Sequence, residues 1–137
     1  MANVSVRIRI DHPTMRAHVG KLSKTAVQRG AARAEERYKG NIRATDRINS
    51  GKMVNTVQQR DVPGRSVMQP AIAVGTPVPY AKFQEYGTRA HGPARAKYLR
   101  FKPKGNSSFV FAKWVRGVRP ARFAQNALDM MRPTDFE

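Results

Sequence analysis

Apolar and polar residues alternate at the start of the chain. The apolar positions are every second residue, with serine or arginine between them: Val4, Val6, Ile8 and Ile10. A period of two is typical of a β-strand that buries one face and exposes the other to water. The pattern therefore predicts a strand over residues 4–10.

A helical pattern follows this segment. Pro13 suits the first turn of a helix, and Asp11 or His12 can cap it. Small and apolar residues then recur at spacings of four and three: Met15, Val19, Leu22, Ala26, Gly30, Ala34 and Tyr38. This predicts one helix over about residues 13–43, on the order of 45 Å long. We interpret the stripe as facing the protein's own core. Contact with another subunit is the alternative, because the helix is longer than one small core requires.

Two hairpins are predicted in the second half of the chain. Residues 53–62 and 66–74 flank the turn pair Pro63 and Gly64, and Pro70 restricts the second arm to an edge strand or a bulge. Residues 98–102 and 109–115 flank a second turn at 103–106, and we expect Trp114 in the core.

The last predicted element is a helix that Pro120 opens and Pro133 ends, with Phe123, Ala127 and Met131 on one face. Residues 134–137 are expected to be frayed. Together the elements predict one α+β domain over residues 1–137. Its mostly antiparallel sheet of about four to five strands is packed by a long N-terminal helix and a shorter C-terminal helix.

Positive charge dominates the composition. The chain has 26 Lys and Arg against 9 Asp and Glu, a net charge of +17, which favours a negatively charged partner, either nucleic acid or an acidic protein. Residues 89–122 contain no acidic residue. We therefore predict that they form a contact surface facing a partner or DNA, with these members: Arg89, Arg95, Lys97, Arg100, Lys102, Lys104, Arg116, Arg119 and Arg122.

Motifs for chemistry are missing from the sequence. There is no cysteine, the carboxylates are scattered, and the three histidines lack metal-ligand spacing. No nucleotide-binding or nucleophile motif occurs, and no apolar run is long enough to span a bilayer. We therefore predict a protein that is not an enzyme and has no cofactor, no metal and no membrane contact.

Residues 74–88 combine aromatic and turn-forming residues. Pro79 can begin a single helical turn that places Tyr80, Phe83 and Gln84 on one side, and Gly87 allows the chain to leave through a positive φ. We expect the aromatic side chains to pack inward. Glu85 is expected to be solvated or paired with an arginine.

This segment resembles the tail-component family of siphophages, the tail-completion or head–tail joining proteins. The family hallmark is a valine-glycine stretch followed by tyrosine-alanine, glutamate, an aromatic residue, glycine and threonine. The chain has Val74, Gly75, Tyr80, Ala81, Glu85, Tyr86, Gly87 and Thr88. Further pieces follow the family order over most of residues 50–128: a serine-glycine turn at Gly51, a Leu-Arg-Phe strand at 99–101, and Phe123 near the last helix. The chain departs from the family at residues 116–118, where many members have His-Pro-Gly.

The resemblance implies a structural virion protein that forms a closed ring, commonly of six subunits, at the neck of the phage. Such a tail terminator caps the tail tube and joins it to the head connector, so its partners are further copies of itself, the tail tube protein and head-completion proteins. It would assemble in the host cytoplasm. The alternative is a nucleic-acid-binding protein, because Tyr98, Phe101 and Trp114 lie among basic residues. The two roles overlap if the basic surface transiently contacts genomic DNA in the neck.

Overall fold

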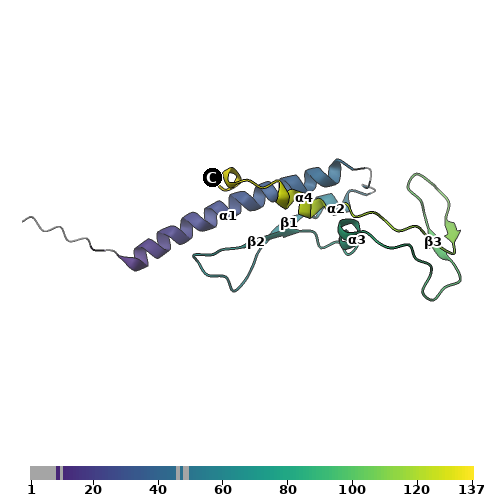
Figure 1. The fold of residues 1–137 in the computed structure, drawn as a ribbon, viewed down its shortest axis with the longest axis horizontal. Coiled ribbons are helices and arrows are strands. Elements are labelled where there is room, and N and C mark those ends of the chain that lie inside the picture. The colour runs from purple at the N-terminus through teal and green to yellow at the C-terminus, as the bar shows by residue number, and fades with distance from the viewer. Residues whose placement is uncertain (1–8, 10, 46, 48–49) are drawn as a thin grey trace, which may run out of the picture.

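The computed structural model describes residues 9, 11–45, 47 and 50–137. A long helix forms the spine of the molecule (Figure 1). The elements in chain order are α1 (His12–Arg43), α2 (Lys52–Asn55), β1 (Gln58–Asp61), β2 (Ile72–Gly75), α3 (Ala81–Tyr86), β3 (Leu99–Phe101), β4 (Val110–Ala112), α4 (Phe123–Asp129) and the 3-10 helix η1 (Pro133–Phe136). The strand predicted over residues 4–10 falls on residues 4–8 and 10, which lie outside the described residues.

The predicted long helix is confirmed. Asp11 has extended backbone geometry at the cap, and a proline occupies the first helical turn. The Thr14 hydroxyl donates to the Asp11 carboxylate at 2.6 Å, and the Met15 N–H donates to the Asp11 carbonyl at 3.0 Å. With 32 residues α1 is about 48 Å long, which exceeds the length of the core that it covers.

The apolar stripe of α1 is buried along only part of its length. Gly30 and Tyr38 are buried, as the core interpretation predicts. Nearer the N-terminus, Met15 is 50% exposed and Leu22 is 60% exposed. Met15 and Leu22 are therefore left largely uncovered by the described residues.

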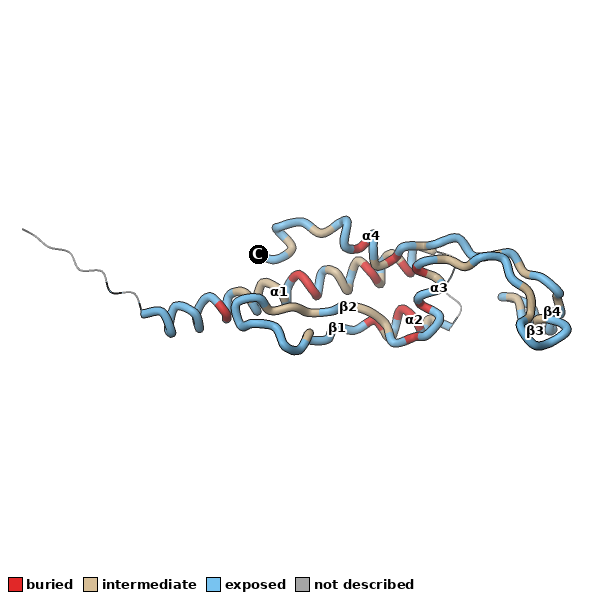
Figure 2. The backbone as a smooth tube through the Cα atoms, turned by 60° about the horizontal axis from the view of Figure 1, so that its bottom comes forward, coloured by how far each residue is buried: buried red, intermediate tan, exposed pale blue. Residues whose placement is uncertain are grey.

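The core is small and lies near the C-terminal half of α1, where α2, α3 and α4 meet it (Figure 2). Phe123 is the most completely buried large side chain, with 2% exposure. The buried cluster consists of Tyr38, Ile42, Met53, Val54, Val57, Val78, Ala81, Phe123 and Ala127. Because few apolar side chains share the burial, each of them contributes a large part of the stability.

The first hairpin is present, but both arms are shorter than predicted, because residues 66–71 lie outside β2. β1 and β2 pair antiparallel from Gln58 opposite Gly75 to Asp61 opposite Ile72. A strand beginning at residue 53 is wrong, because residues 52–55 form the helical turn α2 and place two apolar side chains in the core. Pro70 precedes the paired residues and so interrupts no ladder bond.

The second hairpin is confirmed, but a single sheet of four to five strands is wrong for the described part of the chain. β3 and β4 pair only with each other, as do β1 and β2. The β3–β4 hairpin lies beyond the end of α1, away from the core (Figure 1). Trp114 is 65% exposed, so its prediction as a core residue is also wrong. An apolar alternation determines which side chains share a face, and none of the described residues covers that face of this hairpin.

The C-terminal residues are anchored to α1, which contradicts the predicted fraying. Arg37 donates two hydrogen bonds to the Asp135 carboxylate, at 2.7 and 2.9 Å. Phe136 packs so closely on Gly30 that a Cβ at that position would lie 2.3 Å from its ring. The preceding helix begins at Phe123, three residues later than Pro120, because Arg122 has a left-handed conformation.

Replacing Asp135 with asparagine is expected to lower the melting temperature at neutral pH. The hydrogen bonds from Arg37 and then from the Arg132 backbone lower the pKa of Asp135 below its ordinary value of 3.8. The ionised carboxylate therefore stabilises the fold above the unfolded-state pKa, and this contribution is lost as pH falls through the folded-state pKa. Thermal melts from neutral to acidic pH should show the two proteins converging in acid. Asp61→Asn, at an exposed position, is the matched control and should show no such difference. A constant gap at all pH values would contradict the assignment.

Candidate assembly surface

A long projection, residues 87–121, leaves α3 and returns to α4; we call it the arm. It extends beyond the helices and ends in the β3–β4 hairpin (Figure 2). The Thr88 N–H donates to the Val118 carbonyl at 2.9 Å, and the Val118 N–H donates to the Thr88 hydroxyl at 3.0 Å. His91 and Val115 exchange two backbone hydrogen bonds. The two sides of the arm are therefore tied together at its base.

Glycines allow the close approach at this base. Gly87 has a φ of +74°, which L-residues with a Cβ rarely adopt. A Cβ on Gly117 would lie 2.0 Å from the Thr88 carbonyl oxygen, so only glycine fits there. Gly87 and Thr88, two residues of the family-like segment, thus set the direction in which the arm leaves the body.

Glu85 joins α3 to α4, and its prediction as a solvated or arginine-paired side chain is wrong. Its side chain is buried, and the two carboxylate oxygens accept the N–H groups of Ala124 and Gln125 at 3.0 and 3.1 Å. These are unpaired donors of the first turn of α4, which has no cap from its own N-terminal residue. Burial, and next the negative charge of Glu85, raises the pKa of Tyr38.

The substitution Glu85→Gln is expected to lower the free energy of unfolding by about 1–2 kcal/mol. Glutamine has one acceptor oxygen, so it can satisfy only part of the α4 N-terminus and no longer offers a negative charge to the helix dipole. Urea unfolding at neutral pH measures the change. Glu36→Gln removes an equal charge from an exposed pair and should alter stability by less than about 0.5 kcal/mol. Equal effects for the two variants would refute the capping role.

The aromatic side chains of the family-like segment are exposed, contrary to the predicted inward packing. Tyr80 is 43% exposed, Phe83 is 49% exposed and Tyr86 is 80% exposed. The predicted helical turn itself is confirmed as α3. It buries Ala81 and Glu85 and leaves much of the surface of the three aromatic side chains exposed. They are available for contact with a partner.

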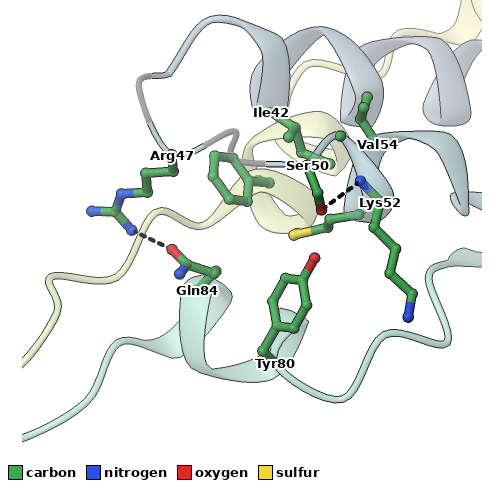
Figure 3. Close-up of a pocket in the computed structure, with 10 residues that line it drawn as sticks. Ile42, Arg47, Ser50, Lys52, Val54, Tyr80 and Gln84 are labelled. Carbon is green, nitrogen blue, oxygen red and sulfur yellow. Dashed lines mark hydrogen bonds between the residues drawn. The ribbon is translucent and has the colours of Figure 1, made fainter. Parts of the chain in front are cut away.

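A pocket of about 270 Å³ lies between α2, α3 and α4 (Figure 3). It brings together three residues of the family resemblance: Gly51, Tyr80 and Phe123. Gly75 ends β2 and is not among the lining residues. Arg47 donates to the Gln84 side chain at 3.3 Å on the rim, and the Tyr80 hydroxyl is directed toward α2. Among the described residues, the lining contains no carboxylate and no histidine. The pocket can therefore receive an apolar side chain and offer hydrogen-bond donors around it.

The predicted basic residues are gathered on the arm, with Arg122 at its root, and all nine are exposed. Sequence reasoning did not select Lys113, which has the same location and exposure. Basic and aromatic side chains alternate there: the Arg100 guanidinium lies 3.9 Å from the Phe109 ring centre, and Lys97 and Lys113 lie 5.7 and 6.0 Å from that of Tyr98. A run of arginine and lysine without acids, interleaved with aromatic residues, was the signal for this surface.

No residue of the arm is buried. Phe111 is 63% exposed and Trp114 is 65% exposed. An isolated two-stranded hairpin is only marginally stable in water unless another surface covers one face. The arm is therefore the clearest candidate for a surface that another molecule completes.

The accessible area of the whole chain leads to the same conclusion. It is 11356 Å², whereas a compact monomer of 15.4 kDa exposes about 7,200 Å². The twelve undescribed residues can contribute at most about 2,000 Å², which leaves an excess of more than about 2,000 Å². Permanent subunit interfaces bury areas of this size.

Within the described ranges, no three His, Asp or Glu side chains are grouped closely enough to hold a metal ion. None of the helices in that part of the chain combines the length and the apolar character needed to cross a membrane. Comparisons with protein-family models, with curated proteins and with solved structures gave no match.

Proposed function

We propose that this chain is a structural subunit of a closed ring, of six copies, at the neck of a long-tailed bacteriophage. The ring would end the tail tube and join it to the head connector. Its partners would be copies of itself, the tube protein and the head-completion proteins. The role depends on interfaces and involves no catalysis.

The exposed arm is the observation that carries the proposal. A soluble monomer rarely leaves three large aromatic side chains such as Phe109, Phe111 and Trp114 uncovered on one hairpin, because exposing them to water is unfavourable. A neighbouring subunit that packs on the arm would cover it. In a closed ring every arm has such a neighbour, so the arm of every copy is covered.

The family-like residues support the same proposal through their positions. Glu85 fixes α4 to α3, and Gly87 and Thr88 fix the base of the arm. A motif that sets the direction of an interaction arm is useful to an assembly protein, since subunits must present their contacts in one orientation. The resemblance in residues 74–88 thus coincides with the part of the fold that aims the arm.

Electron microscopy of tail tubes tests this function. Tubes made from the tube protein encoded by neighbouring genes should acquire an extra disc at one end when this protein is added. Binding at one end is expected because the ring would end the tube on the side of the head connector, and only the terminal surface of the tube on that side would bind it. Tubes that show no added density, or density spread along their length, would contradict the proposal.

A second candidate function is contact with DNA. Trp114 is exposed on the acid-free arm, where aromatic rings can stack on bases while arginines and lysines bind phosphates. Titration of duplex and single-stranded DNA against salt is the test. DNA contact predicts an affinity that falls linearly on a log–log plot, with a slope set by the number of phosphates bound. If the protein does not bind DNA near physiological salt, the partner of the arm is instead an acidic protein surface.

A further inference from the structure

An apolar groove of about 460 Å³ runs along α1, between β2 and the C-terminal elements. α4 and η1 lie along one flank of α1 and the β1–β2 hairpin lies along another (Figures 1 and 2). Small side chains of α1 form the floor, including Ala31 and Ala34, and the walls carry Ile72 and Leu128. Leu128 remains 61% exposed at the rim. The groove is therefore open, apolar and partly uncovered.

One wall of the groove is an unpaired sheet edge. The Val62 N–H donates to the Ala71 carbonyl, which makes these residues a hydrogen-bonded pair of the antiparallel ladder. Since such pairs alternate, the backbone groups of Ile72 and Val74 point away from β1. Both residues also line the groove, and neither has a backbone hydrogen bond to another described element. β2 thus offers the backbone groups that a third strand requires.

We propose that residues 4–10 of a second copy of this chain occupy the groove as a third strand, paired with β2. Their alternation provides one apolar face for α1, formed by Val4, Val6, Ile8 and Ile10, and one polar face for water. The β1–β2 sheet already has one face toward α1 and one face toward water. Gln59 on the inner face donates to Glu35 of α1 at 2.7 Å, while Ala73 on the outer face is exposed. The added strand would continue this arrangement.

The length of the segment favours a second copy over the chain's own groove. The groove floor begins at Val27 and extends to Tyr38, which places it about 22–39 Å along α1 from His12. Residues 4–10 span about 23 Å when extended. Folded back along their own helix, they would bring only Val4 to the near end of the floor. They cannot align with β2 in their own subunit.

This inference deepens the proposed ring and rests on it, by naming one contact between its subunits. A strand donated to the next subunit makes a head-to-tail contact, which closes into a ring when the rotation between copies permits. The arm and the donated strand would then be two separate contacts. Loss of one of these contacts therefore does not remove the other contact.

Mixed single-cysteine chains test the strand, because the natural sequence has no cysteine. One full-length chain carries Ser5→Cys, Arg7→Cys or Arg9→Cys on the outward face of the segment, and the other carries Ala73→Cys. Neighbouring strands lie about 4.7–4.9 Å apart, so the Cα atoms of directly opposite residues fall within the roughly 4.4–6.8 Å that a disulfide can bridge after mild oxidation. At least one pairing should give a covalent heterodimer about tenfold more abundant than the pairing with Ala44→Cys, an exposed residue at the C-terminal end of α1 that does not line the groove.

A second pair of variants tests the apolar face. Val6→Lys would place a charge against the apolar floor and is expected to weaken self-association at least about tenfold, whereas Ser5→Lys on the opposite face should leave it unchanged. Cross-linking with Ala44→Cys that equals that with Ala73→Cys would overturn the strand. So would a disulfide formed within a single chain carrying both Arg7→Cys and Ala73→Cys. A ring observed by native mass without these cross-links refutes the strand alone. Cross-links without a ring refute the proposed ring alone.

Discussion

Replacing Phe123 with alanine is expected to lower the free energy of unfolding by about 3–5 kcal/mol. The ring is 2% exposed and lies in the single buried cluster of the described residues, among side chains of α1, α2 and α4. Removing it leaves a cavity that those elements cannot easily fill. Since a domain of this size is stable by only about 5–15 kcal/mol, this one substitution removes a large fraction of the total stability.

Urea denaturation followed by circular dichroism measures this effect. Phe111→Ala is the matched control, because it removes the same atoms from a side chain that is 63% exposed, and it should change stability by no more than about 0.5 kcal/mol. Equal losses for the two phenylalanines would show that the core is elsewhere.

The second large effect concerns assembly. Phe111→Ser together with Trp114→Ser should leave the fold intact and weaken subunit association at least about 30-fold for each residue. Both side chains are exposed on the arm, where the account places the contact between copies. Large aromatic residues at the centre of an interface contribute most of its binding free energy, so serine at these positions removes the main attraction.

Analytical ultracentrifugation of the double variant provides the measurement. Met68→Ser, which is 42% exposed between β1 and β2, is the control and should associate as the natural chain does. A double variant that assembles normally would exclude the arm as the contact. A variant that melts earlier than the natural chain would show instead that these side chains stabilise the isolated fold.

The sequence predicted correctly those helices and turns whose signal is a proline, a glycine or a regular spacing of side chains within the element itself. Pro13 and the small-residue stripe gave the long helix, and the turn at residues 103–106 gave the second hairpin. The helical turn after Pro79 and the positive φ of Gly87 were predicted for the same reason. In each case the signal lies within a few neighbouring residues.

Burial could not be predicted in the same way. The alternation around Trp114 is that of a half-buried strand, but within the described part of the chain no second layer lies beneath the arm. A period of two indicates which residues share a face and gives no information on whether that face is covered by the same chain or by a partner. The single sheet was wrong for this reason.

Glu85 shows a further limit for the candidate site. Its two partners are backbone N–H groups about forty residues later, exposed because α4 begins without a cap of its own. Backbone donors carry no residue signature, so sequence spacing cannot reveal the contact. An isolated acidic residue between aromatic residues in a strongly basic chain was the only available hint.

Native mass measurement of the full-length chain over a range of concentrations and salt tests the central claim most directly, namely that copies of this chain complete one another in a closed ring. We expect one discrete assembly of six 15.4 kDa chains, about 92 kDa, favoured by salt because screening reduces the repulsion between subunits of net charge +17. A chain that remains monomeric under all these conditions, or that forms a ladder of open-ended species without a closed one, would contradict it.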